Sequence, residues 1–189
     1  RQGQLVTYRA LLSAREPTLR SEPLASLGGS LALFRVSNSA SGLARGNFDV
    51  GAYEQERISL REVNGQGQAI RVEYFATDRL GDAILRLYER YAELLPDGVE
   101  SARAAAAARS FATQLVRLPP DRYAPALSPD VEVIDRRILG TWSARGADAV
   151  LESFGSLSAL AHDIAVCVDD VLCVERGALL VRGQARGTD

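Results

Sequence analysis

The sequence has few of the residue types on which most metal and redox sites depend. It contains two cysteines, Cys167 and Cys173, one histidine, His162, and no methionine. The cysteines lie in one apolar segment without the spacing of a CxxC redox pair or a zinc site. We interpret them as reduced, buried thiols and His162 as a helix-end or surface residue. We therefore expect no metal and no cofactor.

An excess of charge of one sign is also absent. Lys and Arg total 22 and Asp and Glu total 24, which gives a net charge of -2 and no overall field that would attract nucleic acid or an anionic membrane. No apolar run approaches the roughly 18 residues of a membrane span, and the first residues lack the apolar core of a signal peptide. We expect a cytoplasmic protein that binds neither nucleic acid nor membrane.

The first half of the chain has the pattern of antiparallel hairpins followed by a helix. Alternating polar and apolar residues over 53–63 and 69–75, joined by an Asn-Gly-Gln-Gly turn, predict one hairpin, and Gly28-Gly29 predicts another over 24–37. We expect Pro17 and Pro23 to break the strand pattern before the hairpin over 24–37. Apolar residues at helical spacing predict a helix over 80–95 that is capped at Thr77-Asp78, ends at Pro96 and lies on this sheet.

The second half predicts helices first and strands later. An alanine-rich segment predicts a helix over 100–118, followed by a short helix over 121–127, a strand over 131–135 and a helix over 146–161. Apolar segments over 164–174 and 178–182 predict two strands after these helices, with a break or bulge at Asp169-Asp170. The fold class is α+β, with a domain boundary that divides the chain into residues 1–96 and 97–189.

Five stretches carry a resemblance to a known family. Ser-Pro-Asp-Val-Glu-Val-Ile-Asp-Arg-Arg at 128–137, Arg-Gly-Ala-Asp-Ala at 145–149 and Ile-Ala-Val-Cys-Val-Asp-Asp-Val at 164–171 resemble the opening of a SnoaL-like domain of the NTF2-like superfamily. Arg-Val-Glu-Tyr-Phe at 71–75 and Asp-Arg-Leu at 78–80 are similar to the later half of that family. The chain thus resembles the junction of two tandem copies, and its ends read as those of a piece cut from a longer protein.

The resemblance implies a cone in which a curved antiparallel sheet packs on helices around an apolar pocket. Residues 1–96 would be the C-terminal part of a first domain and residues 97–189 the N-terminal part of a second, and the two parts can combine into one permuted cone. Tandem pairs of this kind resemble the tails of large multidomain bacterial regulators that carry ATPase or nucleotide-cyclase modules. Covalently linked neighbouring domains, a small apolar ligand and a dimer through the open sheet face are the partners that it implies.

The resemblance also directs attention to a few side chains as a ligand pocket. Enzymes of the superfamily use an Asp, His or Tyr in the pocket as general acid or base, and an Asp in apolar surroundings has a raised pKa. Asp135, next to two arginines, and Asp169 are the catalytic candidates, with Tyr74, Tyr123 and Trp142 as further pocket residues. The simpler alternatives are that Asp135 pairs with an arginine and that Asp169 lies in a surface bulge.

Two functions follow as hypotheses. The chain has no phosphate-binding GK[ST] loop and no nucleophile elbow, so neither nucleotide binding nor Ser-His-Asp chemistry is indicated. We favour a non-catalytic ligand-binding or assembly module in a larger multidomain regulatory protein. The alternative is a cofactor-independent isomerase, hydrolase or cyclase that uses an aspartate as general base. Fold class alone does not decide between them.

Overall fold

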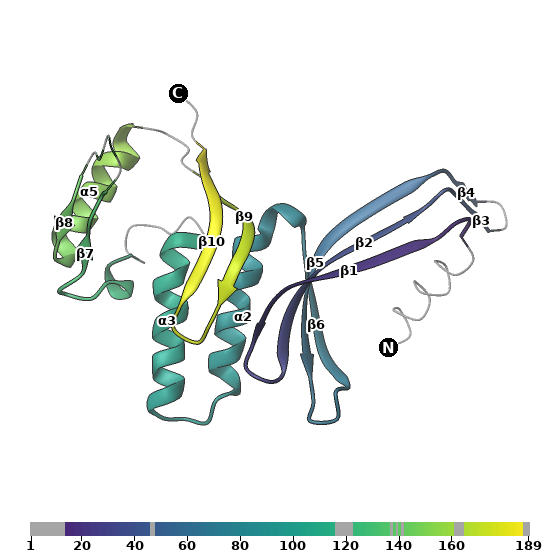
Figure 1. Cartoon of the computed structure of the whole chain (residues 1–189), viewed down its shortest axis with the longest axis horizontal. Helices are drawn as coiled ribbons and strands as arrows, with labels where there is room; N and C mark the ends of the chain where they lie inside the picture. Colours follow the sequence, from purple (N-terminus) through teal and green to yellow (C-terminus); the bar gives the residue numbers. More distant parts are fainter. Residues whose placement is uncertain are drawn as a thin grey trace. The chain divides into compact units, whose positions relative to one another are not determined.

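The computed structural model of the chain describes residues 14–45, 48–115, 123–136, 138, 140, 142–160 and 165–186. They belong to two compact units, Arg1–Thr77 and Asp78–Asp189. The first unit is built from strands, whereas the second combines helices with two-stranded sheets (Figure 1). The predicted α+β class is therefore confirmed. His162 lies outside the described residues.

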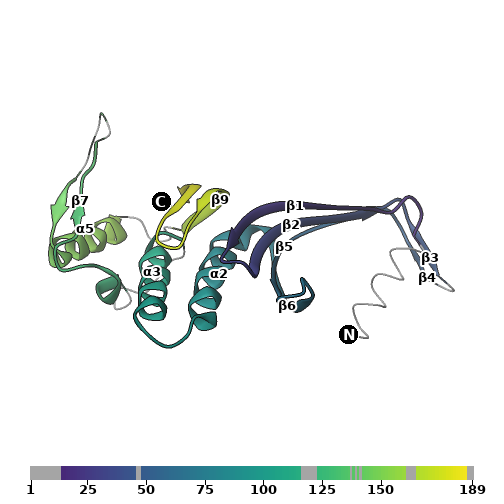
Figure 2. The same cartoon turned by 60° about the horizontal axis from the view of Figure 1, so that its bottom comes forward.

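The first unit contains a four-stranded antiparallel sheet in the order β1-β2-β5-β6. Its strands are β1 (Thr18–Leu27), β2 (Leu31–Ala40), β5 (Tyr53–Val63) and β6 (Ala69–Phe75). A separate hairpin of β3 (Leu43–Arg45) and β4 (Phe48–Val50) lies where β2 and β5 end (Figure 2). Both hairpins predicted from the sequence are present, because each depends on a local turn and on alternation.

Pro23 does not break the strand as predicted but lies inside β1. The register of β1 against β2 shifts between Pro23 and Ala25. A proline removes one backbone donor, and an edge strand with a register shift tolerates that loss. Because β1 is an edge strand of the sheet, the strand continues through the proline.

One face of this sheet carries most of the apolar core of the first unit. Leu33 and Ile58 are fully buried, and Leu31 and Leu60 are 2% exposed. The register places all four on the same face. Leu33 pairs with Leu60, Ile58 lies two residues from Leu60 on β5, and Leu31 lies two residues from Leu33 on β2. Ile58 and Leu60 therefore face inward, as the alternation over 53–63 requires of one face of the strand.

The second unit begins with a helical hairpin. A 3-10 turn, η1 (Thr77–Arg79), leads into α2 (Leu80–Leu94), and α3 (Val99–Leu115) follows after a short loop. The cap predicted at Thr77-Asp78 is wrong: the residue before α2 is Arg79, without a side-chain cap. Instead the Arg79 guanidinium donates two hydrogen bonds, of 2.6 and 2.9 Å, to the Asp82 carboxylate in the first turn.

The apolar stripe of α2 is buried, with Ile84, Leu87 and Tyr88 fully inaccessible. It was predicted to lie on the preceding sheet; the structure packs α2 against α3 and against β9 (Ala165–Val174). For this reason the compact units divide at Thr77, before α2, whereas the sequence placed a boundary at 96–97. The helix belongs with the elements that follow it.

Among the described residues after α3, the second unit contains a 3-10 turn, two short paired strands, one further helix and a hairpin. The turn is η2 (Ala124–Ala126), the paired strands are β7 (Glu132–Val133) and β8 (Ala144–Arg145), and the helix is α5 (Ala147–Leu160). Strand β10 (Leu179–Arg186) pairs with β9 in a two-stranded sheet, separate from the sheet that holds β5 and β6. Asp170 pairs with Arg182 and Val168 with Gly183, which leaves Asp169 as the extra residue of a bulge. The predicted bulge is confirmed.

Candidate functional site

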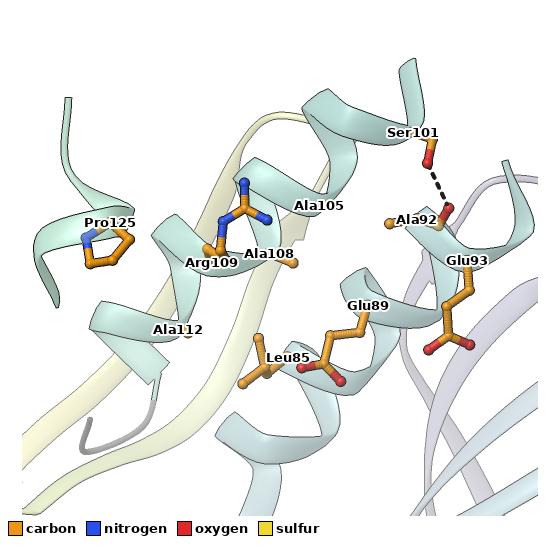
Figure 3. Close-up of a pocket in the computed structure, with 10 residues that line it drawn as sticks. All are labelled: Leu85, Glu89, Ala92, Glu93, Ser101, Ala105, Ala108, Arg109, Ala112 and Pro125. Atoms are coloured by element: carbon orange, nitrogen blue, oxygen red, sulfur yellow. Dashed lines mark hydrogen bonds between the residues drawn. The ribbon is translucent and has the colours of Figure 1, made fainter. Parts of the chain in front are cut away.

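A cleft of about 640 Å³ opens between α2, α3 and η2 in the second unit (Figure 3). Most of its lining is apolar and small, and polar groups stand at its rim. The apolar residues are Leu85, Ala92, Ala105, Ala108, Ala112 and Pro125, and the polar ones are Glu89, Glu93, Ser101 and Arg109. A concave apolar site with a few polar groups is the usual form of a small-molecule site.

The alanine content of α3 explains why the cleft exists. Ala104, Ala108 and Ala112 recur at helical spacing and are at most 6% exposed. Methyl side chains favour the helix and permit its packing on α2, but they fill little of the space between the helices and η2. From the sequence, this segment was predicted only to form a helix. Its alanines at 105, 108 and 112 were the available signal for a hollow face.

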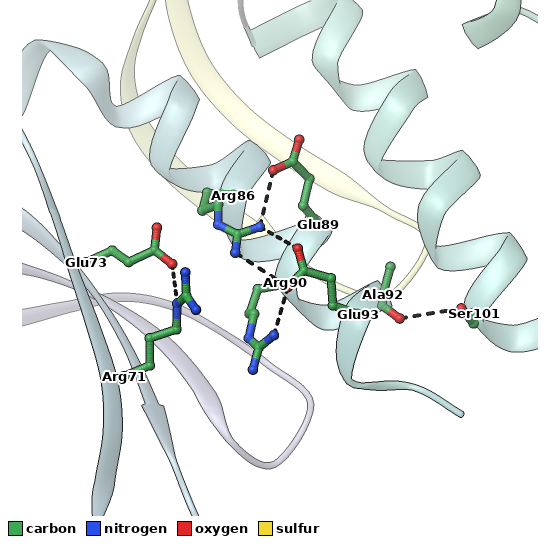
Figure 4. Close-up of polar contacts among 8 residues, drawn as sticks. All are labelled: Arg71, Glu73, Arg86, Glu89, Arg90, Ala92, Glu93 and Ser101. Atoms are coloured by element: carbon green, nitrogen blue, oxygen red, sulfur yellow. Dashed lines mark hydrogen bonds and ion pairs between the residues drawn. The ribbon is translucent and has the colours of Figure 1, made fainter. Parts of the chain in front are cut away.

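The carboxylate of Glu93 at the rim is held by two arginines (Figure 4). Arg86 Nη1 and Arg90 Nη1 each donate a hydrogen bond of 2.8 Å to it. The bond from Arg86 and then that from Arg90 lower the pKa of Glu93 to about 2. A general acid or base works best with a pKa near the operating pH, so Glu93 is suited to neither role.

The rest of the rim offers one cation. Arg109 is exposed on the α3 side and forms no ion pair with the residues that the structure describes. Glu89 on the α2 side stands 3.5 Å from Arg86. Ser101 Oγ donates to the carbonyl of Ala92 at 3.5 Å, which joins the two helices at the end of the cleft.

The structure brings part of the predicted pocket together elsewhere in the second unit. Tyr123 and Trp142 both lie against Phe154 of α5, with ring centroids 5.5 and 5.7 Å from it. Asp135, two residues after β7, is half-buried, and its backbone N–H donates to Ser143 Oγ at 3.2 Å. Since Ser143 follows Trp142, the backbone of Asp135 lies close to the chain segment that carries this ring.

Tyr74 lies in the other unit, on β6. The guanidinium of Arg57 stands 4.6 Å from the centroid of its ring. Tyr74 was predicted as a pocket residue through the family resemblance alone. Within the first unit its ring makes a cation–π contact with Arg57.

Asp169 is exposed in the bulge of β9, where its carboxylate accepts a hydrogen bond of 2.9 Å from Gln184. The neighbouring Asp170 accepts from Arg182 at 3.1 Å and from the backbone N–H of Val171 at 2.9 Å. Both carboxylates are therefore engaged by hairpin partners. This arrangement agrees with the simpler alternative, a bulge at the surface.

Two further classes of site were sought in the described part of the chain. Among these residues no group of three or more His, Cys, Asp or Glu side chains is placed to hold a metal ion. None of the helices there has the length and apolar character that a membrane span requires.

The chain was also compared with models of known protein families, with curated proteins and with solved structures, and none of the three comparisons gave a match.

Proposed function

We propose that the chain is a non-catalytic ligand-binding module of the SnoaL-like type, part of a larger cytoplasmic regulatory protein, and that its α2–α3 cleft takes a small apolar ligand. One observation supports this most: the cleft joins an apolar, alanine-rich lining to a carboxylate that two arginines keep ionised. Such a lining gains free energy by burying apolar surface of a ligand, at about 25 cal/mol per Å². The Glu93 carboxylate at its rim, with a pKa of about 2, is not poised to exchange a proton at neutral pH.

The proposal predicts that filling the cleft abolishes binding. Ala105→Leu places a larger side chain in the lining, whereas Ala106→Leu makes the same change at the exposed neighbouring position of α3. With the fluorophore 1-anilinonaphthalene-8-sulfonate, whose aromatic rings are apolar, as probe, we expect saturable binding to the original chain and to Ala106→Leu. For Ala105→Leu we expect affinity to fall by about tenfold or more, equivalent to ~1.4 kcal/mol.

Two results of that titration would contradict the proposal. The first is an absence of saturable binding to the original chain. The second is an equal loss of affinity in both leucine variants, which would mean that the probe reports a general change in the helix. Alanine and leucine have similar helix propensities, so α3 itself should form in both variants.

The cofactor-independent enzyme remains a second candidate because of Asp135. This half-buried residue bonds through its backbone to Ser143, beside the aromatic group of Trp142, Tyr123 and Phe154. Aspartate is among the side chains that serve as general acid or base in enzymes.

Turnover of hydrophobic ketones and epoxides distinguishes the two functions. As a non-catalytic module, the chain should give the same background rate before and after Asp135→Asn. A rate that Asp135→Asn lowers by about 10²-fold or more would be that of a general acid or base, and would replace the first proposal with the second. Ser143→Ala is the control, since it removes only the partner of the Asp135 backbone.

A further inference from the structure

In the four-stranded sheet of the first unit, all the acidic residues lie on one of the two faces. Residues directly opposite each other in an antiparallel pair point to the same face, and successive residues of a strand point to opposite faces. The register of the sheet then assigns every glutamate of the four strands to the face that carries Leu33 and Ile58. These glutamates are Glu22, Glu54, Glu56, Glu62 and Glu73.

The other face holds two arginines and none of these carboxylates. Arg57 pairs with Val36 and Arg61 pairs with Ala32, so both point away from the acidic face. The Arg57 guanidinium lies 4.6 Å from the ring centroid of Tyr74, and that of Arg61 lies 4.8 Å from the ring centroid of Phe34. We call this surface, made by Arg57, Arg61, Tyr74 and Phe34, the arginine face.

Most donors of the two guanidinium groups are not used within the described part of the chain. Arg57 donates to Gln55 at 3.4 Å and Arg61 donates to Ser59 at 3.3 Å, and neither forms an ion pair with a described residue. Arg57 Nε is buried without a hydrogen-bond partner. Stacking occupies the flat side of a guanidinium and leaves its N–H edge for a carboxylate, which it can bind through two parallel hydrogen bonds.

The two arginines also have a defined spacing. They are four residues apart on β5, and at about 3.3 Å per strand residue this puts their backbones ~13 Å apart. Tyr74, which is 48% exposed, adds accessible apolar surface on the same face. A complementary partner therefore carries two carboxylates at that spacing with apolar atoms beside them.

We propose that the arginine face binds an extended acidic segment of a partner protein, with carboxylates at positions i and i+4 and an apolar side chain at i+2. In an extended segment these three side chains point to one side and repeat the spacing of β5. Nucleic acid fits less well, because two arginines on a chain of net charge -2 provide few phosphate contacts and no attracting field.

The test uses the full chain and a fluorescein-labelled peptide of threonine and valine with two glutamates four residues apart. Arg57→Gln and Arg61→Gln should each weaken binding by about three- to tenfold, and the double variant should abolish it. Arg20→Gln is the matched control, because it makes the same charge change at an exposed residue that the register places on the acidic face. This control should bind as tightly as the original chain.

A double Arg57→Lys, Arg61→Lys variant keeps both charges and loses the stacked, two-bond geometry. We expect it to bind with intermediate affinity, and it is the decisive variant if circular dichroism shows that the glutamine variants are unfolded. Equal weakening by Arg20→Gln, undiminished binding by the lysine variant, or equal binding of a peptide with adjacent glutamates would overturn the proposal. Tighter binding of an oligothymidylate through the same arginines would also overturn it and would assign the face to nucleic acid.

Discussion

Gly81→Ala is expected to lower the free energy of unfolding of the second unit by about 2–3 kcal/mol. Gly81 lies in the first turn of α2, where a Cβ atom would stand 2.3 Å from the carbonyl oxygen of Leu115 and 3.4 Å from Val168 Cγ2. The first of these atoms belongs to the backbone at the end of α3, so it cannot rotate away. The helices must separate, which outweighs the ~1 kcal/mol that alanine gains over glycine in a helix.

Gly155→Ala is the matched control for this change. Gly155 is exposed within α5, and nothing lies within 4 Å of the position that its Cβ would occupy. We expect this variant to raise the free energy of unfolding by about 0.5–1 kcal/mol. Denaturant unfolding followed by the fluorescence of Trp142, the only tryptophan in the sequence, reports on the second unit. Similar effects of the two variants would contradict the close approach of α2 and α3.

Tyr88→Phe is expected to destabilise the second unit by about 1–2 kcal/mol at neutral pH. Tyr88 is fully buried in α2, and its hydroxyl lies 2.8 Å from the carbonyl of Glu175 and 2.9 Å from that of Ala178. It donates to the turn between β9 and β10, and its removal leaves the Glu175 carbonyl without this partner. Hydrogen exchange of the β9–β10 amides should accelerate in the variant, and unchanged exchange would contradict the role of the hydroxyl.

The same residue gives the chain a dependence on alkaline pH. Burial raises the pKa of Tyr88 to about 12 from its ordinary value of 10.0. The folded state therefore keeps the proton that the unfolded state loses first, so stability is complete below pH 10 and falls as the pH rises toward 12. At about 1.4 kcal/mol per pKa unit the loss is ~2–3 kcal/mol. The decrease of stability with rising pH should be present in the original chain and absent in Tyr88→Phe. Equal decreases in both proteins would argue that Tyr88 is not buried in this way.

The elements that sequence reasoning predicted best depend on local signals. The hairpin over 53–75 follows from alternation and an Asn-Gly turn, and the bulge at Asp169 follows from two adjacent carboxylates inside an apolar strand. The partner of the α2 stripe was assigned wrongly, because an apolar stripe specifies that it will be buried but not against which element. The cleft was not foreseen for the same reason, since it requires α2, α3 and η2 together.

The candidate site was predictable only in part. Tyr123 and Trp142 were grouped through the resemblance, but Phe154, against which both lie, was not among the predicted pocket residues. Tyr74 was placed in the same pocket and is instead described beside Arg57 in the first unit. Membership of the SnoaL-like family stays a prediction, as do the neighbouring domains.

The most direct test of a binding module is to find where an aromatic probe binds. In ¹H–¹⁵N spectra of the full chain titrated with 1-anilinonaphthalene-8-sulfonate, the largest shift changes should fall on the cleft residues Leu85, Ala105, Ala108 and Ala112. The changes should saturate, and Ala105→Leu should remove them. Saturable changes centred on Asp135 and Trp142 instead, with the cleft amides unmoved, would contradict the proposal and direct attention to the aspartate.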